Sequence, residues 1–138
     1  MSTSPLRRGR WQDDRGMLGV AAALLIVMVL AGGALIYDGG RALVAQRQII
    51  NVAEGAARAG TATADRNGLQ EGAAVAAARA HIAAADVPDS DVVSVAVAPD
   101  RVTVTLRAHR TGVFTSLLGN DTMTVTGTGT SLSSYNNP

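Results

Sequence analysis

The chain has 138 residues, a formal net charge of +1 and no cysteine. A charge this close to neutral argues against nucleic acid as the main ligand, because binding phosphate backbones needs a clustered basic face. Without cysteine there is no disulfide framework, no cysteine-based metal site and no thiol nucleophile. The apolar residues are mostly alanine and valine, with a single Phe. Any core is therefore thin, and a small domain built on it gains stability by packing against copies of itself or a partner.

A basic leader and a long apolar run open the chain. The leader, residues 1–16, contains Arg7, Arg8, Arg10 and Arg15 together with Asp13 and Asp14. Residues 17–37, MLGVAAALLIVMVLAGGALIY, contain no charged residue. About 20 apolar residues in a helix cross the hydrocarbon core of a bilayer, whereas a cleaved secretory signal has an apolar stretch of only about 7–15 residues. We therefore expect residues 17–37 to form a transmembrane helix that is retained.

The charge distribution predicts the orientation of this helix. Basic segments stay cytoplasmic, so the leader is expected inside and everything after Tyr37 outside a cell membrane crossed once. Trp11 and Tyr37 lie on either side of the run, where amphipathic rings often sit at headgroup level. The alternative is a buried helix in a soluble protein. It is disfavoured because about 100 remaining residues with one Phe could hardly cover such a helix.

Two charged residues mark the predicted exit from the membrane. Asp38 either engages a partner or pairs with Arg41, or it is an ordinary interfacial charge that ends the span. The second interpretation is favoured because a charge at this depth costs little. Between them, Gly39-Gly40 forms either a hinge or a mildly weakened stretch of helix, and both interpretations remain open.

Residues 38–64 continue the helical pattern outside the membrane. Small apolar residues recur there at three- and four-residue spacing, and they allow another helix to approach closely. Together with two glycines of the span they form the predicted helix-packing interface: Gly32, Gly33, Ala53, Ala56, Ala57 and Gly60. The stripe after the membrane could instead pack against the chain's own hairpin or second helix, and the pattern does not distinguish these possibilities.

Residues 65–138 form the predicted head. Asn67-Gly68 indicates a turn, and an alanine-rich helix follows over about 69–85. The period then changes to two, which predicts a hairpin of strands at about 92–98 and 101–109. The inward positions on these strands are Val93, Val95 and Val97, then Val102, Val104 and Leu106. A helical turn is expected over 113–118, and a third strand over 122–130 places Met123, Val125 and Gly127 on one face.

No arrangement of residues predicts catalysis or metal binding. His81 and His109, the two histidines, lie on different elements with no carboxylate or cysteine at ligand spacing. Glu54 and Glu71 are on separate helices and form no acid–base pair. No nucleophile elbow or glycine-rich phosphate loop occurs. We therefore expect a structural protein without an enzymatic activity, a cofactor, a metal or a small-molecule substrate.

The first half of the chain resembles a known family. In order, it contains Arg15-Gly16, the apolar run, Asp38-Gly39-Gly40-Arg41, Gln48 and the alanine-rich stretch Asn51 to Gly60. This order resembles the N-terminal module of TadE/TadG-like proteins, which belong to the tight-adherence (Tad, Flp-type) pilus systems of bacteria and archaea. The resemblance covers about residues 15–62. It implies a pilin-like α+β fold with a long N-terminal helix, a second helix and about three antiparallel strands, and partners among pilus subunits or further copies.

One departure from prepilin-type sequences bears on which kind of pilus protein the chain resembles. If processing occurs, the resemblance places it between Gly16 and Met17. Prepilin-type substrates then have a Glu at the fifth mature position, but the fifth residue after Gly16 is Ala21 and the apolar run holds no Glu. A minor pseudopilin or a membrane-anchored assembly protein therefore fits better than a major pilin. The alternative from another class is a single-span, membrane-tethered binding module unrelated to pili.

Overall fold

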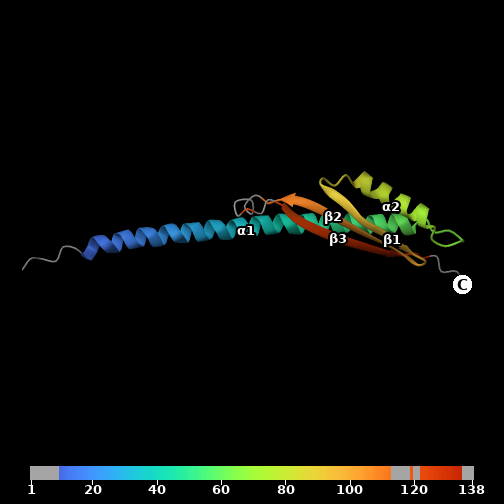
Figure 1. The fold of residues 1–138 in the computed structure, drawn as a ribbon. Coiled ribbons are helices and arrows are strands. Elements are labelled where there is room, and N and C mark those ends of the chain that lie inside the picture. The colour runs from blue at the N-terminus through green and yellow to red at the C-terminus, as the bar shows by residue number, and fades with distance from the viewer. Residues whose placement is uncertain (1–9, 113–118, 120–121, 135–138) are drawn as a thin grey trace, which may run out of the picture. The chain divides into compact units, whose positions relative to one another are not determined.

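The computed structural model describes residues 10–112, 119 and 122–134 of the chain (Figure 1). Helix α1 is Arg10–Thr61 and helix α2 is Glu71–Ala85. Strands β1 (Ser90–Ala98), β2 (Arg101–Thr111) and β3 (Thr122–Leu132) follow. The chain divides into two compact units, Met1–Tyr37 and Asp38–Pro138. We call the second unit the head and the run Met17–Tyr37 the anchor.

The head is a two-layer α+β structure. Its three strands form an antiparallel sheet in the order β1-β2-β3. The head segment of α1 and the whole of α2 lie on one face of this sheet, because buried residues of both helices share one cluster with β2. The other face is solvent-exposed and rich in threonine. Its hydroxyls pair across strands, with 3.1 Å between the Oγ1 atoms of Thr103 and Thr130. The predicted pilin-like α+β fold is confirmed.

Helix α1 is continuous from Arg10 to Thr61 and starts earlier than the predicted boundary at Met17. The sequence explains this continuity, since no proline occurs between these residues. The helix ends at Thr61, slightly before the expected residue 64. A tighter turn follows the helix, because Thr63 donates two hydrogen bonds to the carbonyl of Gly60, three residues earlier. One comes from its backbone N–H at 3.2 Å and the other from its Oγ1 at 2.7 Å.

The predicted turn at Asn67-Gly68 is confirmed. The Gly68 N–H donates to the Asp65 carbonyl at 2.9 Å, and the Asn67 N–H donates to Asp65 Oδ1 at 2.8 Å. Gly68 has a φ of +90°, a conformation that glycine adopts without a Cβ penalty. Helix α2 then starts at Glu71, after the extended Gln70, and ends at Ala85. Asp86, the next residue, is in the left-handed region.

Strand β1 differs from its prediction in register. It starts at Ser90 rather than residue 92, and a bulge interrupts its pairing with β2 between Val92 and Ser94. The inward positions are therefore Val92, Val95 and Val97, whereas Val93 is 48% exposed. The prediction that Val93 faces the core with Val95 and Val97 is wrong. A bulge adds one residue to a strand and so reverses the alternation on one side of it.

Strands β2 and β3 follow the predicted alternation and extend beyond the predicted ends. Val102, Val104 and Leu106 are fully buried as expected, and Ala108 continues their row. Strand β3 continues to Leu132 instead of ending at residue 130. The helical turn predicted for 113–118 lies outside the described residues.

The β1–β2 connection is a tight hairpin closed by the pair Ala98 and Arg101. Arg101 donates to both carboxylate oxygens of Asp100, from Nε at 3.0 Å and from Nη2 at 2.9 Å. This hydrogen-bonded contact holds the pKa of Asp100 below its usual value. The pair is exposed to solvent, so its contribution to stability is small.

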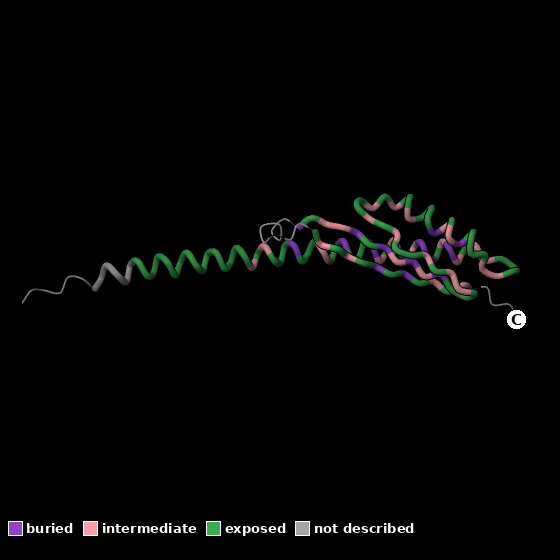
Figure 2. The backbone as a smooth tube through the Cα atoms, viewed as in Figure 1, coloured by how far each residue is buried: buried purple, intermediate pink, exposed green. Residues whose placement is uncertain are grey.

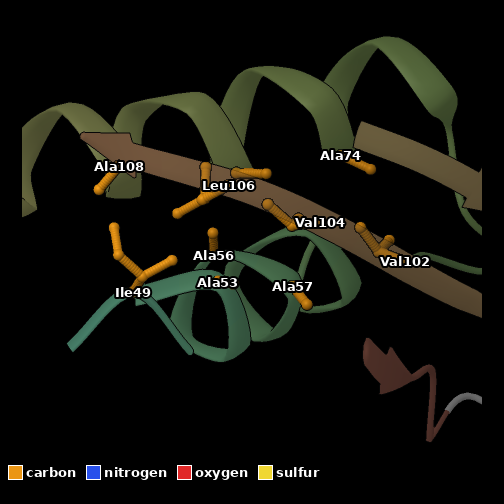
Figure 3. Close-up of a cluster of buried hydrophobic side chains, with 10 residues drawn as sticks. Ile49, Ala53, Ala56, Ala57, Ala74, Val102, Val104, Leu106 and Ala108 are labelled. Carbon is orange, nitrogen blue, oxygen red and sulfur yellow. The ribbon is translucent and has the colours of Figure 1, made fainter. Parts of the chain in front are cut away.

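The core of the head is built mainly from small side chains. Figure 3 shows Ile49 and Ala56 of α1 directed toward β2. Ala53 and Ala57 of α1 and Ala74 of α2 belong to the same buried cluster. Among the residues that the structure describes, the large side chains that are fully buried are Ile49, Leu106, Val102 and Val104. Such a core buries little area per residue. Its stability therefore depends on how closely the backbones approach.

The closest approach is between β3 and α1. Gly127 and Gly129 are the inward residues of β3 opposite Leu106 and Val104. A Cβ added at Gly127 would lie 2.7 Å from Ile49 Cγ2 and 2.8 Å from the Ile50 nitrogen. A Cβ added at Gly129 would overlap the α1 backbone at Ala53 and Glu54. Glycine inside a strand often marks this kind of contact with a second backbone.

We predict that Gly129→Ala destabilises the head by about 1–3 kcal/mol, the usual cost of overpacking. The matched control is Gly72→Ala in α2, where an added Cβ meets no atom within 4 Å. The control should gain up to about 1 kcal/mol from the higher helix propensity of alanine. The measurement is the free energy of unfolding of the full chain in detergent micelles, from denaturant titration followed by circular dichroism. Equal stabilities for Gly129→Ala and the parent would contradict the backbone contact.

Candidate functional site

The anchor is exposed along nearly its whole length, and Gly32 and Ala34 are half-buried. Its large side chains, such as Leu25 at 63% and Val29 at 72%, are covered by no other part of the described chain (Figure 2). The helix is long and apolar enough to cross a membrane. Apolar side chains of this size need a non-aqueous environment. The anchor is therefore a surface that either lipid or protein must cover.

The residues expected at the membrane exit lie in different surroundings. Asp38 is only 3% exposed and belongs to the head unit. The sequence pattern did not predict this burial of the Asp38 side chain. Arg41 is exposed about one helical turn further along α1. Both Asp38 and Arg41 interact with other groups of the chain. The α-helix continues through Gly39 and Gly40, where an added Cβ would meet no atom within 4 Å.

The small residues of the predicted helix-packing interface separate into two groups. Ala53, Ala56 and Ala57 are fully buried within the chain's own core, and Gly60 is packed against Val102 and the Ala74 carbonyl. Their contacts match the alternative in which the stripe packs on the chain's own head. Gly32 and Gly33 lie in the anchor with no atom within 4 Å of an added Cβ. The possible processing site, Gly16-Met17, is also exposed and within α1.

His81 and Glu54 have structural positions. The His81 imidazole lies over Gly55 of α1, at the place that a Cβ of Gly55 would occupy. This contact between His81 and Gly55 therefore brings α2 close to α1. Glu54 accepts from Arg58 Nη2 at 3.1 Å, one helical turn away on the exposed side. Glu71 starts α2. None of these three residues lines the polar pocket at the end of the sheet.

His109 connects all three strands at one end of the sheet. Its Nε2 lies 3.6 Å from Asp91 Oδ2 on β1, and its Nδ1 lies 3.3 Å from Thr124 Oγ1 on β3. A hydroxyl and a carboxylate on opposite imidazole nitrogens form the connectivity of a nucleophile relay. Here, however, the Asp91 side chain is 74% exposed and the Nε2–Oδ2 distance is long. The arrangement therefore acts as a polar link between strands.

A polar pocket lies beside this histidine. It has a volume of about 470 Å³ and is formed where β1 starts, β2 ends and β3 starts. Its lining residues are Val87, Asp89, Ser90, Asp91, His109, Arg110, Thr111 and Thr122. The Arg110 side chain is held in one wall of the pocket, because its Nη1 donates to the Pro88 carbonyl at 2.6 Å and to the His109 carbonyl at 3.0 Å. The pocket presents hydroxyls and two carboxylates to a ligand.

Sequence reasoning did not find this pocket. Its residues come from three separate segments, and only the strand pairing brings them together. A partial signal was present in Asp86-Val87-Pro88-Asp89-Ser90-Asp91, an acidic connection next to a strand. Among the described residues, no group of three or more acidic, histidine or cysteine side chains is arranged to hold a metal ion.

Comparisons with protein-family models, with curated proteins and with solved structures find no match to this chain. What the chain does must therefore be argued from the anchor, the head and the pocket.

We predict that Leu25→Arg combined with Val29→Arg releases most of the chain from the membrane. An arginine at the centre of a membrane helix costs about 2.5–3.5 kcal/mol on insertion scales. The measurement is the fraction of protein that stays in the membrane after alkaline extraction. Thr128→Arg combined with Thr130→Arg, on the exposed face of the sheet, adds the same charge and should leave this fraction unchanged. Equal retention of both variants would show that the anchor is not embedded in lipid.

Proposed function

We propose that this protein is a membrane-anchored minor pseudopilin or assembly protein of a Tad-type pilus, with a structural role. Its N-terminal leader is cytoplasmic and its head extracytoplasmic. The protein acts by packing against other pilus subunits and has no catalytic role. Its partners are the membrane and these subunits, including further copies of itself.

One observation supports this proposal most directly. A single helix, α1, is bare and apolar in the anchor but packed under a three-stranded sheet in the head. This is a pilin-like architecture, and it suits a subunit that is stored in lipid before assembly. The order of motifs from Arg15-Gly16 to Gly60 is the second support, because it resembles the TadE/TadG-like module.

The mechanism follows from the environment of the anchor. In the membrane, lipid covers its exposed leucine and valine side chains. When subunits assemble, anchors of neighbouring subunits cover them instead, and small residues such as Gly32 and Gly33 permit close helix contact. Both environments are apolar, so transfer of the anchor between them involves no desolvation of a charge. No Glu inside the run sets a register between anchors, which fits a minor or auxiliary subunit.

Deletion of the gene is expected to abolish or strongly reduce Tad pili at the cell surface and the adhesion that depends on them. A wild-type copy should restore both. A copy with Leu25→Arg and Val29→Arg should restore neither, because its anchor does not insert. Pili counted by electron microscopy and adherent cells counted on a solid surface give the two readouts. Unchanged pili and adhesion after deletion would contradict the proposed function.

The orientation can be measured by thiol labelling, since the chain contains no cysteine. In intact spheroplasts a membrane-impermeant maleimide should label Thr128→Cys on the outer face of the sheet. It should label Ser4→Cys only after the membrane is permeabilised. Labelling of Ser4→Cys in intact spheroplasts would reverse the orientation. A mature N-terminus at Met17 by mass spectrometry, with Ser4→Cys lost, would show cleavage after Gly16.

The polar pocket favours a second candidate function, a membrane-tethered module that binds an extracytoplasmic ligand and is unrelated to pili. Its volume and hydroxyl-rich lining suit a small polar ligand. The two candidates differ in their dependence on other genes. A pilus subunit depends on a neighbouring secretion ATPase, two small polytopic membrane proteins and a short pilin, whereas a tethered module functions without them.

A further inference from the structure

The pocket at the end of the sheet is lined by two carboxylates, three hydroxyls, an imidazole and a guanidinium. Among the described residues, the ion-pair partner of the Asp91 carboxylate is His109 Nε2, at 3.6 Å. Asp89 is exposed, and its backbone carbonyl accepts from the His109 N–H at 2.8 Å. The cation in the wall, Arg110, already donates to two carbonyls. A ligand that carries a positive charge and several N–H donors therefore fits the open positions.

The two ends of the head carry different groups. Ile49 of α1 faces Gly127, which pairs with Leu106, whereas Gly60 packs against Val102. The C-terminal end of α1 therefore lies at the start of β2, and the pocket lies at the opposite end of the sheet, where β2 ends. Figure 1 shows the connection from α1 to α2 at one end of the head and the start of β1 at the other.

The connection from α1 to α2 presents a guanidinium group. Arg66 is exposed in the turn that the Asp65–Gly68 bridge closes, and it makes no hydrogen bond or ion pair with any described residue. The chain has no lysine, so every side chain that is always cationic is an arginine. Arg58 and Arg101 pair with neighbouring acids in the same copy. The remaining unpaired arginines of the head lie on faces of helices or strands: Arg47, Arg79 and Arg107.

We propose that copies of this chain associate head to tail, with Arg66 of one copy donating to Asp89 and Asp91 in the pocket of the next. This inference rests on the proposed function, because it assigns a contact between assembled subunits. The guanidinium fork matches carboxylate geometry and can bond two oxygens at once. Because donor and acceptor lie at opposite ends of one head, the contact is heterologous and repeats along a row of copies.

The contact requires one copy to be shifted along α1 by about the length of the head. The helix rises about 1.5 Å per residue, so the stretch from Ala45 to Thr61 alone spans about 25 Å. Two heads at the same level along the head segment of α1 would lie side by side and could not make this contact. It therefore forms only between heads that are displaced from one another along this segment.

Thiol cross-linking tests the contact in the full-length, cell-expressed protein. Asn67→Cys lies next to Arg66, and Thr111→Cys lines the pocket, so one chain carrying both should form a ladder of multimers with a short bismaleimide. Either substitution alone should give dimers at most. The two positions lie at opposite ends of one head, and for that reason they cannot be linked within a copy.

Charge reversal then tests the ion pair itself in this double-cysteine background. Arg66→Glu should reduce the ladder at least tenfold, and so should Asp89→Arg combined with Asp91→Arg. Combining all three reversals should restore it. Arg79→Glu on α2 makes the same charge change as Arg66→Glu away from both ends of the head and should leave the ladder intact. Thermal unfolding of each variant identifies any that fail to fold.

The outcomes separate this inference from the proposed function. A ladder that survives Arg66→Glu, or single reversals that are not rescued by their combination, would overturn the head-to-tail contact. Recovery of the protein with sheared surface pili but without a ladder would also overturn it and leave the proposed function standing. Absence from the pilus fraction, with normal pili after deletion, would overturn both. If the pocket binds a small solute instead of Arg66, no ladder should form in any variant, and this outcome would overturn the head-to-tail contact.

Discussion

The arrangement of the head depends on the contact between the backbone of β3 and the backbone of α1. Gly127 and Gly129 bring the strand so close to α1 that no Cβ fits between them. Strand β2 pairs with β3 along its whole length, so the same contact also sets the height of Val102, Val104 and Leu106 above the helix. Ala53, Ala56 and Ala57 keep most of the buried stripe of α1 small, and Ile49 is the one large, fully buried side chain among the described residues of this helix. The hydroxyls of Thr61 and Ser131, 3.0 Å apart, hold the far end of the same contact.

The contact also divides α1 between two environments. Under the sheet its buried residues are mostly alanine, whereas the anchor exposes large side chains such as Leu25 and Ile26. Large aliphatic side chains fill space well in lipid, but they would hold a sheet away from the helix. Large side chains also occur after Tyr37, at Leu43, Val44 and Ile49, so burial under the sheet marks the change of environment more reliably than side-chain size or the first charge does. Asp38 illustrates this, because it is buried in the head unit although it directly follows the apolar run.

Local patterns predicted most of the elements of the head but not their partners. The alternation from Val102 to Leu106 predicted a strand and its buried side, because two-residue periodicity has one interpretation there. At Val92-Val93 two adjacent valines support either register, and only the bulge decides between them. The stripe from Ala53 to Gly60 fits the chain's own sheet or another subunit equally well, since both need small residues. The pocket was not predictable because Asp91 and His109 meet only through strand pairing.

In the proposed assembly, the uncharged anchor contributes little to the choice of neighbouring subunit, so the head has to determine it. Association of apolar helices in an apolar solvent has little directional preference unless a polar group fixes the register. The run Met17–Tyr37 contains no charged group, and the nearest carboxylate, Asp38, is enclosed in the head unit. In the proposed assembly, contacts that distinguish one neighbour from another therefore come mainly from charged and hydrogen-bonding groups of the head. A guanidinium at one end of the head and two carboxylates at the other meet this requirement, since they define both a direction and a spacing along the helix axis.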